Sequence, residues 1–221
     1  KAVGEELADR IFYLTAKTIT ATVAKETFAL LEKNGYRAKT IQITAKEKLC
    51  PCDEMECNPV TCPYAKGHFD RVNDAVFDLL HRCEMIERDD ILSQADRYTV
   101  CPFELCLDTA SWCDNIICDY NYVFDPNVYL KRFFQEGIKG DYIFLIDEAH
   151  NMVERSRQMY SAQIYKEDFL TVKRIMKEHS RSIEKALEKC NKILLGMKRE
   201  CENYTVYDTF GNMVFSFMRL M

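Results

Sequence analysis

The segment DYIFLIDEAH, residues 141–150, constrains the fold more than any other part of the chain. Its apolar run leads directly into Asp147 and Glu148. A short, continuous apolar run of this kind is typical of a strand buried in a parallel sheet, and we expect a central strand here. Two carboxylates at the end of such a strand suit a magnesium ion and an attacking water. Asp147 would hold the ion, Glu148 would orient or deprotonate the water, and His150 would sense the nucleotide. A charged helix start after a strand is the alternative.

The rest of the chain alternates between strand and helix patterns, which favours an α/β fold with a parallel sheet. Residues 11–15 form an apolar strand pattern, a helical period follows as far as Asn34-Gly35, and residues 38–44 alternate and are β-branched. The further expected elements are a helix over 67–88 ended by Asp89-Asp90, a helix with Pro102 in its first turn, strands over 116–126 and 159–165, a helix over 128–136, and a long helix or helix pair over 166–199.

The turn after the first strand carries a second candidate site. It reads Thr15-Ala16-Lys17-Thr18. Hydroxyl groups, a lysine and backbone amides at a strand-to-helix turn suit a phosphate, because the first turn of a helix has unpaired N–H donors. Thr15, Lys17 and Thr18 are therefore candidate contacts to a nucleic-acid backbone. A plain helix cap is the alternative, and both roles can hold at once.

Eleven cysteines need a chemical reason, and nine of them lie between Cys50 and Cys118. The stretch LCPCDEMECNPVTCP, residues 49–63, has little apolar surface to bury. Clustered cysteines in a chain without an export signal indicate a metal site more than a disulfide framework. The thiolates that suit a [4Fe–4S] cluster belong to Cys50, Cys57, Cys62 and the distant Cys101.

The choice among the cysteines stays open on pattern alone. Cys52 is an alternative to Cys50, and Cys106 is an alternative to Cys101. Structural zinc also uses four cysteines, typically with C-x-x-C spacing, and no C-x-x-C occurs in this chain. Packing as free thiols is the remaining interpretation.

Charge and hydropathy bear on the location and the partners. The net charge is -5, so the total does not indicate a strongly basic nucleic-acid binder, although a local basic patch is compatible with it. The sequence has no apolar run long enough for a transmembrane helix and no signal-peptide order at its start. We expect a cytoplasmic protein without membrane contact.

Five segments together resemble the XPD/DinG group of superfamily 2 iron–sulfur DNA helicases, and its bacterial XPD-like branch in particular. These segments are FYLTAKT, KLCPCDEMECNPVTCPYAKGHFDR, VCPFEL, YNYVFDP and IDEAHNM. The first resembles the family's first DNA-contacting motif, and the second and third together resemble its four-cysteine insert. The fourth resembles the segment before the DEAH strand, and the fifth resembles the Walker B motif. Their order and spacing agree along nearly the whole chain.

The resemblance implies a partial RecA-like parallel sheet with a cysteine-rich Fe–S insert and a helical extension, the Arch. The implied parts are motor domain 1 over residues 1–47, the iron–sulfur insert over 48–108, the second part of motor domain 1 over 109–165, and the start of the Arch over 166–221. The implied cluster ligands are Cys50, Cys57, Cys62 and Cys101.

The resemblance also implies an activity. Relatives of this kind use ATP and Mg²⁺ to translocate on single-stranded DNA and to unwind forked DNA in repair or recombination. Tyr64 and Tyr122 are candidates for stacking on bases, whereas Phe69 and Phe124 are expected to pack in the core. None of the seven glycines forms G-x-x-x-x-G-K-[ST]. The phosphate loop and the second helicase domain are expected outside this chain, which alone should not hydrolyse ATP.

The sequence leaves two alternative functions open. A cysteine-rich zinc or redox binding module without motor activity would make the DEAH tetrapeptide a coincidence. An RNA helicase is the third possibility, because superfamily 2 motors share these motifs. The basic faces of residues 166–199 would either track phosphates or simply face solvent.

Overall fold

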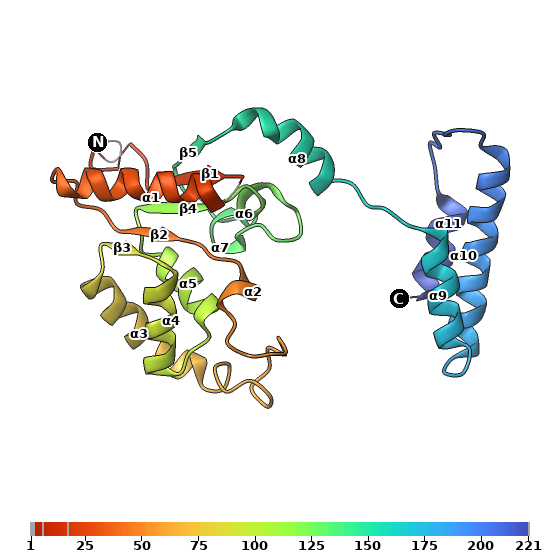
Figure 1. Ribbon diagram of the computed structural model, residues 1–221, viewed down its shortest axis with the longest axis horizontal. Coiled ribbons are helices and arrows are strands. Elements are labelled where there is room, and N and C mark those ends of the chain that lie inside the picture. Colours follow the sequence, from red (N-terminus) through yellow and green to blue (C-terminus); the bar gives the residue numbers. More distant parts are fainter. Residues whose placement is uncertain (1–2, 6, 17, 221) are drawn as a thin grey trace. The chain divides into compact units, whose positions relative to one another are not determined.

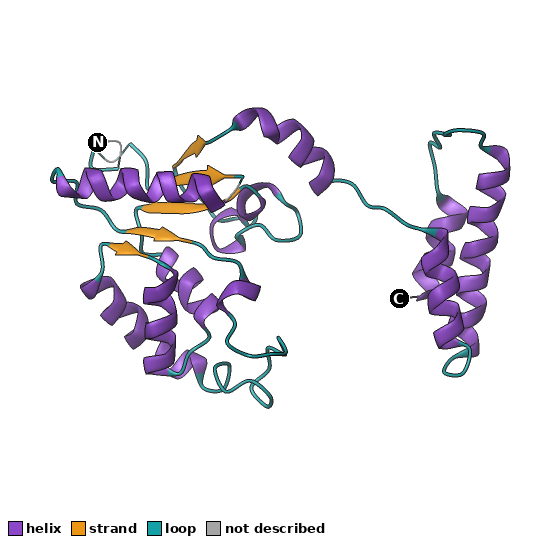
Figure 2. Cartoon of the chain, viewed as in Figure 1, coloured by secondary structure: helices purple, strands orange, loops and turns teal. Residues whose placement is uncertain are grey.

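The computed structural model describes residues 3–5, 7–16 and 18–220, without the side chains of residues 18–20. Within these limits the chain alternates strands and helices and then becomes wholly helical (Figures 1 and 2). The elements are β1 (Arg10–Thr15), α1 (Thr18–Lys33), β2 (Thr40–Gln42), α2 (Lys46–Leu49), α3 (His68–Arg82), β3 (Met85–Ile86), α4 (Arg88–Tyr98), α5 (Pro102–Ala110), β4 (Asn115–Asp119), α6 (Asn121–Phe124), α7 (Lys131–Phe134), β5 (Tyr142–Ile146), the 3₁₀ helix η1 (Ala149–Asn151), α8 (Met152–Met159), α9 (Lys166–Met176), α10 (Arg181–Glu200), α11 (Gly211–Phe217) and the 3₁₀ helix η2 (Met218–Leu220).

The five strands form one parallel sheet in the order β3-β2-β4-β1-β5. In the register of β1, Phe12 lies opposite Ile116 of β4 on one side and Phe144 of β5 on the other. β5 therefore lies at the edge of the sheet in the described part of the chain. The prediction of a central strand at this position is wrong, because an apolar run reports a tendency to be buried and not a place in the strand order.

Successive side chains of the central strands point to opposite faces of the sheet, and each face has its own cover. Ile117 packs against Ala21, Ala24 and Phe28 of α1 on one face. The other face carries the main core, which includes Phe12, Leu14, Ile116, Cys118, Phe133 and the buried residues of α3, α4 and α5. The sheet is thus sandwiched between α1 and a group of shorter helices.

Two of the helices between β2 and β4 correct one expected boundary. A single helix was expected to run as far as Asp89-Asp90, but α3 ends at Arg82 and α4 begins at Arg88. Glu87 and Asp90 form a capping box, in which the Asp90 carboxylate accepts the Glu87 amide proton at 2.9 Å. Acidic residues in a first turn stabilise a helix start, so the pair opens a helix and does not end one.

An exposed aromatic residue corrects the expected core. Phe69 in the first turn of α3 is 86% exposed, so the prediction that it packs in the core is wrong. The buried side of α3 is formed by His68, Val72, Ala75, Val76 and Leu79. Phe124, by contrast, packs partly buried against the main core, as expected.

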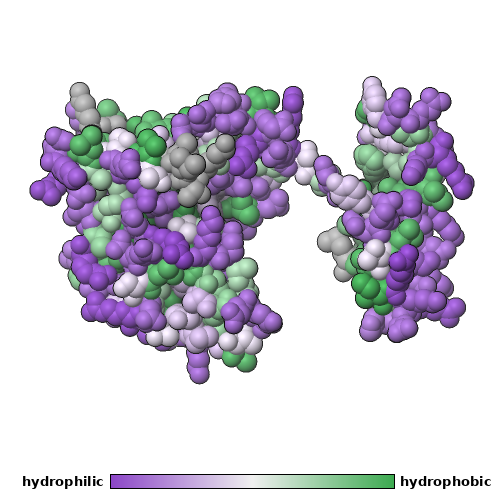
Figure 3. Space-filling model, in the orientation of Figure 1, coloured by the Kyte–Doolittle hydropathy of each residue, from purple (hydrophilic) through white to green (hydrophobic). Residues whose placement is uncertain are grey.

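The chain divides into two compact units, residues 1–160 and 161–221. The second unit is helical, with a core of Phe169, Leu187, Cys190 and Met213, and it confirms the helix pair expected over 166–199 as α9 and α10. A strand expected over 159–165 is absent from the described residues, where α8 ends at Met159 and irregular chain follows. Apolar side chains such as Val206 remain exposed on this unit, and Figure 3 shows hydrophobic residues scattered among hydrophilic ones.

Among the helices of the described residues, none is both long and apolar enough to cross a membrane.

Candidate functional site

Parallel strands bring their carboxyl ends to a single edge of the sheet, and polar residues gather there. β1 ends at Thr15, β2 at Gln42, and β4 at Asp119, while Asp147 directly follows β5. The Asp147 amide extends the ladder by donating to the Leu14 carbonyl oxygen at 3.0 Å. In open α/β sheets this edge is where ligands bind.

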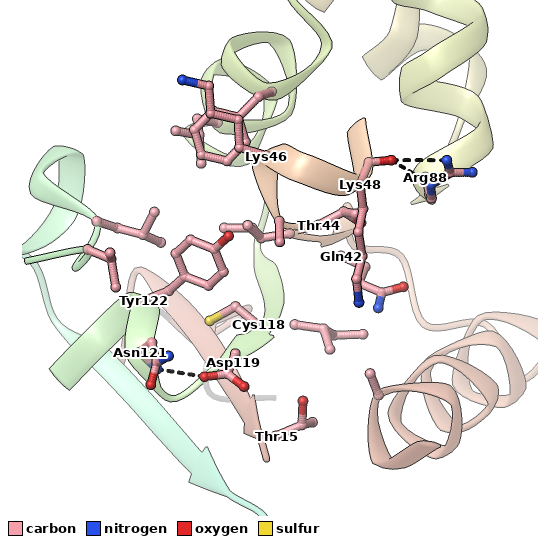
Figure 4. A pocket seen from close by; sticks show the side chains of 18 of the residues that line it. Thr15, Gln42, Thr44, Lys46, Lys48, Arg88, Cys118, Asp119, Asn121 and Tyr122 are labelled. Carbon is pink, nitrogen blue, oxygen red and sulfur yellow. Dashed lines mark hydrogen bonds between the residues drawn. The ribbon is translucent and has the colours of Figure 1, made fainter. Parts of the chain in front are cut away.

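A groove of about 1020 Å³ opens along this edge (Figure 4). The ends of β1, β2 and β4, the start of α1, and the segments around α2, α5 and α7 line it. The residues labelled in Figure 4 are Thr15, Gln42, Thr44, Lys46, Lys48, Arg88, Cys118, Asp119, Asn121 and Tyr122. The groove has the volume and the mixed polar and apolar wall of a binding site.

The charge of the groove differs in sign from that of the chain. Six basic and five acidic residues line it, although the whole chain has a net charge of -5. Lys25 is paired with Glu87 at 3.1 Å, whereas Lys48 and Lys131 have no ion-pair partner in the described part of the chain. Unpaired lysines in a groove are suited to bind phosphate groups. The basic lining residues are Lys25, Lys46, Lys48, Arg88, Lys131 and Arg132.

The predicted catalytic carboxylates lie where the sequence places them, after β5. Asp147 is partly buried, and Glu148 and His150 are exposed. Glu148 has a left-handed backbone with φ 50°, which is uncommon for a residue with a side chain. Its carboxylate lies 3.2 Å from His150 Nδ1. The structure therefore brings Glu148 and His150 together and turns the chain sharply just after Asp147.

Sequence reasoning missed three residues at the strand ends, and one of them contacts Asp147. The Tyr120 hydroxyl donates to the Asp147 carbonyl oxygen. Asp119 lies 3.9 Å from Arg155 of α8, and the Arg155 guanidinium also donates to the Ala16 carbonyl oxygen at 3.2 Å. Burial, and then the nearby carboxylates of Asp147 and its neighbours, raise the pKa of Tyr120. A signal for Asp119 existed, because NIICD is also an apolar strand that ends in a carboxylate; none pointed to Arg155.

The predicted nucleic-acid contacts are only partly gathered at the groove. Thr15 is buried and lines the groove. Tyr122 also lines it, and burial raises the pKa of Tyr122 to about 12. Lys17 lies outside the described residues, and Thr18 begins α1 with its side chain not described. Tyr64 is half-buried in the loop before α3 and does not line the groove.

The predicted cysteine ligands lie near one another in two subgroups. Cys50 follows α2, and the Cys52 thiol contacts the thiols of Cys62 and Cys50. Desolvation, together with these contacts, raises the pKa of Cys52 to about 11. Cys101 precedes α5 as its N-cap, and Cys57 lies near it.

Lys46 lies beside the second subgroup. A hydrogen bond with Cys57 raises its pKa, and Cys101 contributes. The donor chemistry fits a thiolate-ligated metal centre, because the thiols come from one loop and from the first turn of a distant helix. Nevertheless, no three His, Cys, Asp or Glu side chains within the described residues come together closely enough to hold a metal ion.

The surplus cysteines differ in their surroundings. Cys106 is buried in the main core, where its thiol lies 3.8 Å from the Gln42 carbonyl oxygen, and Cys113 and Cys118 are also buried. Burial raises the pKa of both Cys106 and Cys113 to about 12. These three thiols pack as small apolar side chains.

Comparison with protein families decides the relationship. The model of the DEAD_2 family matches residues 23–169, which include most of the groove wall, the cysteine-rich segment and the DEAH tetrapeptide. The chain belongs to the DEAD_2 family. The resemblance inferred from five short segments is thereby confirmed as an XPD-like relationship.

Two known proteins are similar in sequence to this DEAD_2 chain. It is 32% identical to the general transcription and DNA repair factor IIH helicase subunit XPD/RAD3 of Saccharomyces cerevisiae over 108 residues, which are 49% of this chain and 13% of that protein. It is 28% identical to the Fanconi anemia group J protein homolog of Gallus gallus over 76 residues, 34% of this chain and 6% of that protein. The chain therefore matches only a small part of the length of either relative.

A solved structure shares the fold of this DEAD_2 chain. The structure titled "Truncated XPD" matches with a TM-score of 0.55 and 15% identity, covering 96% of this chain and 62% of that one. The likeness confirms the α/β class with a partial RecA-like parallel sheet.

Proposed function

We propose that this DEAD_2 chain is part of an ATP-dependent DNA helicase and that its groove binds single-stranded DNA. The groove at the carboxyl edge carries the proposal, because it presents unpaired lysines on an acidic chain. Residues 48–108 hold thirteen acidic and six basic residues, and two of these six, Lys48 and Arg88, line the groove, which favours the groove wall over the insert as a whole for phosphate contacts. The name of the yeast relative, a helicase subunit of a DNA repair factor, supports this choice.

ATP hydrolysis would take place at the end of β5. Asp147 would hold Mg²⁺, Glu148 would orient or deprotonate the attacking water, and His150, 3.2 Å from Glu148, would respond to the nucleotide. Tyr120 and Arg155 would hold the ends of β4, β1 and β5 in place around this site. Because the 221 residues contain no G-x-x-x-x-G-K-[ST] segment, we expect the isolated chain not to hydrolyse ATP at a meaningful rate.

The cysteine-rich segment would hold a [4Fe–4S] cluster. The ligands would be Cys50, Cys57, Cys62 and Cys101, and the burial of Cys106 in the core supports Cys101 over it. A bound cluster would supply four iron–thiolate links and a one-electron redox centre. The contacts of Cys52 with Cys50 and Cys62 keep Cys52 as a competing ligand.

In the intact protein, a second helicase domain would complete the ATP site, and the strand would move through the groove as the motor opens and closes. Forked DNA in repair or recombination is the proposed substrate, encountered at the cytoplasmic nucleoid. Tyr122 would stack on a base within the groove, and Thr15, Lys17 and Thr18 would contact the backbone. Tyr64 would contact DNA only outside the groove, since it does not line it.

Oligonucleotide binding tests the groove. We expect the chain to bind a fluorescein-labelled single-stranded DNA, and Lys48→Ala with Lys131→Ala to weaken it. The plot of log Kd against log salt should lose about 0.7 in slope for each phosphate contact removed. Lys33→Ala, on the exposed end of α1, is the matched control. Unchanged binding in the double variant would remove the groove from the proposal, and tighter binding of RNA than of DNA would favour the RNA helicase.

Metal analysis tests the cluster separately. We expect about four iron atoms and four acid-labile sulfides per anaerobically purified chain, with loss of both in Cys57→Ser. Zinc without iron would favour the cysteine-rich binding module instead. The DEAD_2 relationship would stand in either case, because it does not depend on the metal.

A further inference from the structure

One imidazole of this chain is buried, and its position is tightly determined. His68, the first residue of α3, is 4% exposed, whereas the other three histidines are exposed. Gly67 before it has φ +68°, and a Cβ there would come within 2.6 Å of the Arg71 guanidinium. Arg71 in turn donates to the carbonyl oxygens of Tyr98 and Thr99 at 2.8 and 2.6 Å, which ties the start of α3 to the end of α4.

The two ring nitrogens of His68 face two different parts of the molecule. Nδ1 accepts the backbone N–H of Cys101 at 3.2 Å. In the neutral ring the proton must therefore be on Nε2. Nε2 faces the Asp108 carboxylate, with Nε2 and Oδ2 separated by 3.7 Å, and it has no hydrogen-bond partner within the described residues. A buried donor without a hydrogen bond is costly, and the Asp108 carboxylate is the acceptor that Nε2 faces.

Asp108 connects this imidazole to the groove. Its other oxygen forms an ion pair with Arg132, and Arg132 also pairs with Glu104 at 2.8 Å, one helical turn earlier on α5. Arg132 and Glu104 both line the groove. A continuous series of contacts thus runs from the Cys101 amide through His68 and Asp108 to a cation in the groove wall.

We propose that His68 is a positioning residue, which holds the first turn of α5 with Cys101 on one side and Arg132 of the groove wall on the other. The inference rests on the proposed function, since it assigns Cys101 to the metal centre and Arg132 to the DNA groove. An imidazole meets this requirement because one rigid ring accepts at one nitrogen and donates at the other. Metal retention and DNA affinity would then share one side chain.

Two substitutions separate the two roles. In His68→Asn the amide oxygen takes the place of Nδ1 and still accepts from Cys101, but nothing reaches Asp108. In His68→Gln the amide nitrogen takes the place of Nε2 and faces Asp108, but the Cys101 amide loses its acceptor. The Cys101 amide supports a metal ligand, and loss of such a support typically costs about 10- to 100-fold in metal affinity.

The expected results are opposite for the two variants. His68→Asn should keep the iron and labile sulfide of the wild-type chain and weaken single-stranded DNA binding about threefold to tenfold. His68→Gln should lose iron to a chelator about 10- to 100-fold more readily, while its metal-loaded fraction binds DNA as the wild type does. His81→Asn and His81→Gln, which change an exposed histidine on the same helix, should leave both properties unchanged.

Measurements on the metal-free chain without DNA test the positioning role of His68 independently of the proposed function. In the metal-free chain, the Cys101 amide should exchange with solvent faster in His68→Gln only, and the Arg132 side-chain NMR signals should shift in His68→Asn only. Wild-type behaviour of both variants, or equal damage by both in every measurement, would overturn the inference. If the wild-type chain bound neither iron nor DNA while the NMR split persisted, the proposed function would fail and the positioning role would stand.

Discussion

β4 and β5 flank the same strand and have the same sequence pattern, but their surroundings differ. Both pair in parallel with β1, and each carries an apolar run that ends in an aspartate, Asp119 or Asp147. Ile116 of β4 is 0% exposed, whereas Ile146 of β5 is 37% exposed. The hydrophobic pattern therefore predicts both strands and does not distinguish a central from an edge position.

The difference between the two strands comes from their neighbours. β4 has β1 and β2 on its two sides, and helices cover both of its faces. β5 has only β1 as a strand partner in the described residues. An edge strand presents unpaired backbone groups and half-exposed side chains, which explains why Ile146 is more exposed than Ile116.

The largest expected effect is a difference in the free energy of unfolding between matched substitutions in β4 and β5. Ile116→Ala should lower the free energy of unfolding by about 2–5 kcal/mol, because it leaves a cavity in a closed core. Ile146→Ala, the matched change in β5, should cost about 1 kcal/mol or less, because the site is already partly exposed. Urea unfolding followed by circular dichroism measures both. Equal losses would show that β5 is as well covered in solution as β4.

A smaller effect depends on pH and concerns a buried thiol of β4. Burial, and then Asp119, raise the pKa of Cys118 well above its ordinary value of 9.0. The folded chain thus binds this proton more tightly than the unfolded chain, so the thiol's contribution is complete below pH 9 and is lost as the pH rises above it. The loss should be about 1.4 kcal/mol per pH unit for one thiol.

Cys118→Ala isolates that contribution. Its unfolding free energy should fall less steeply than that of the wild type between pH 9 and pH 10.5, because the remaining thiols are the same in both chains. The measurement is urea unfolding at a series of pH values. Parallel pH profiles for the two chains would argue that the Cys118 proton is not held by folding.

The smallest effect tests the link between the two strands. Tyr120→Phe removes the hydroxyl that donates to the Asp147 carbonyl oxygen and should cost about 1 kcal/mol. Amide hydrogen exchange should accelerate in β5 and not in β4. Tyr160→Phe is the control, since Tyr160 is 73% exposed and its hydroxyl lies 3.4 Å from the Phe124 carbonyl oxygen. Faster exchange in both strands would mean that Tyr120 supports the whole sheet edge.

Local pattern predicted much of the fold, and its errors have physical causes. The strand at residues 11–15, the helix that begins at Pro102 and the helix pair in the second unit depend on spacing and on first-turn chemistry, which act over a few residues. Asp89-Asp90 was misassigned because carboxylates favour the start of a helix, whereas the true end of α3 is marked by His81 and Arg82 in its last turn. Phe69 was misassigned because its own helix turns it away from the core.

The candidate site also combines residues that the sequence pattern predicted with residues that it did not. Asp147, Glu148 and His150 follow an apolar strand directly, so their neighbourhood along the chain was visible in the sequence. Arg155 was not, because its contact with Ala16 joins residues that are far apart in the chain. The groove depends on such contacts throughout, since its wall combines strand ends with loops from separate parts of the first unit.

The sequence by itself determined the α/β class, the order of most elements, the carboxylates after an apolar strand and the family to which the chain belongs. Those properties depend on short-range chemistry and on motif order. Only the tertiary structure decided that β5 lies at an edge, that Cys106 is in the core while Cys101 begins α5, and that His68 lies between Cys101 and Asp108. Parallel strands joined by helices bring distant segments together, and the free energy of that packing depends on every layer at once.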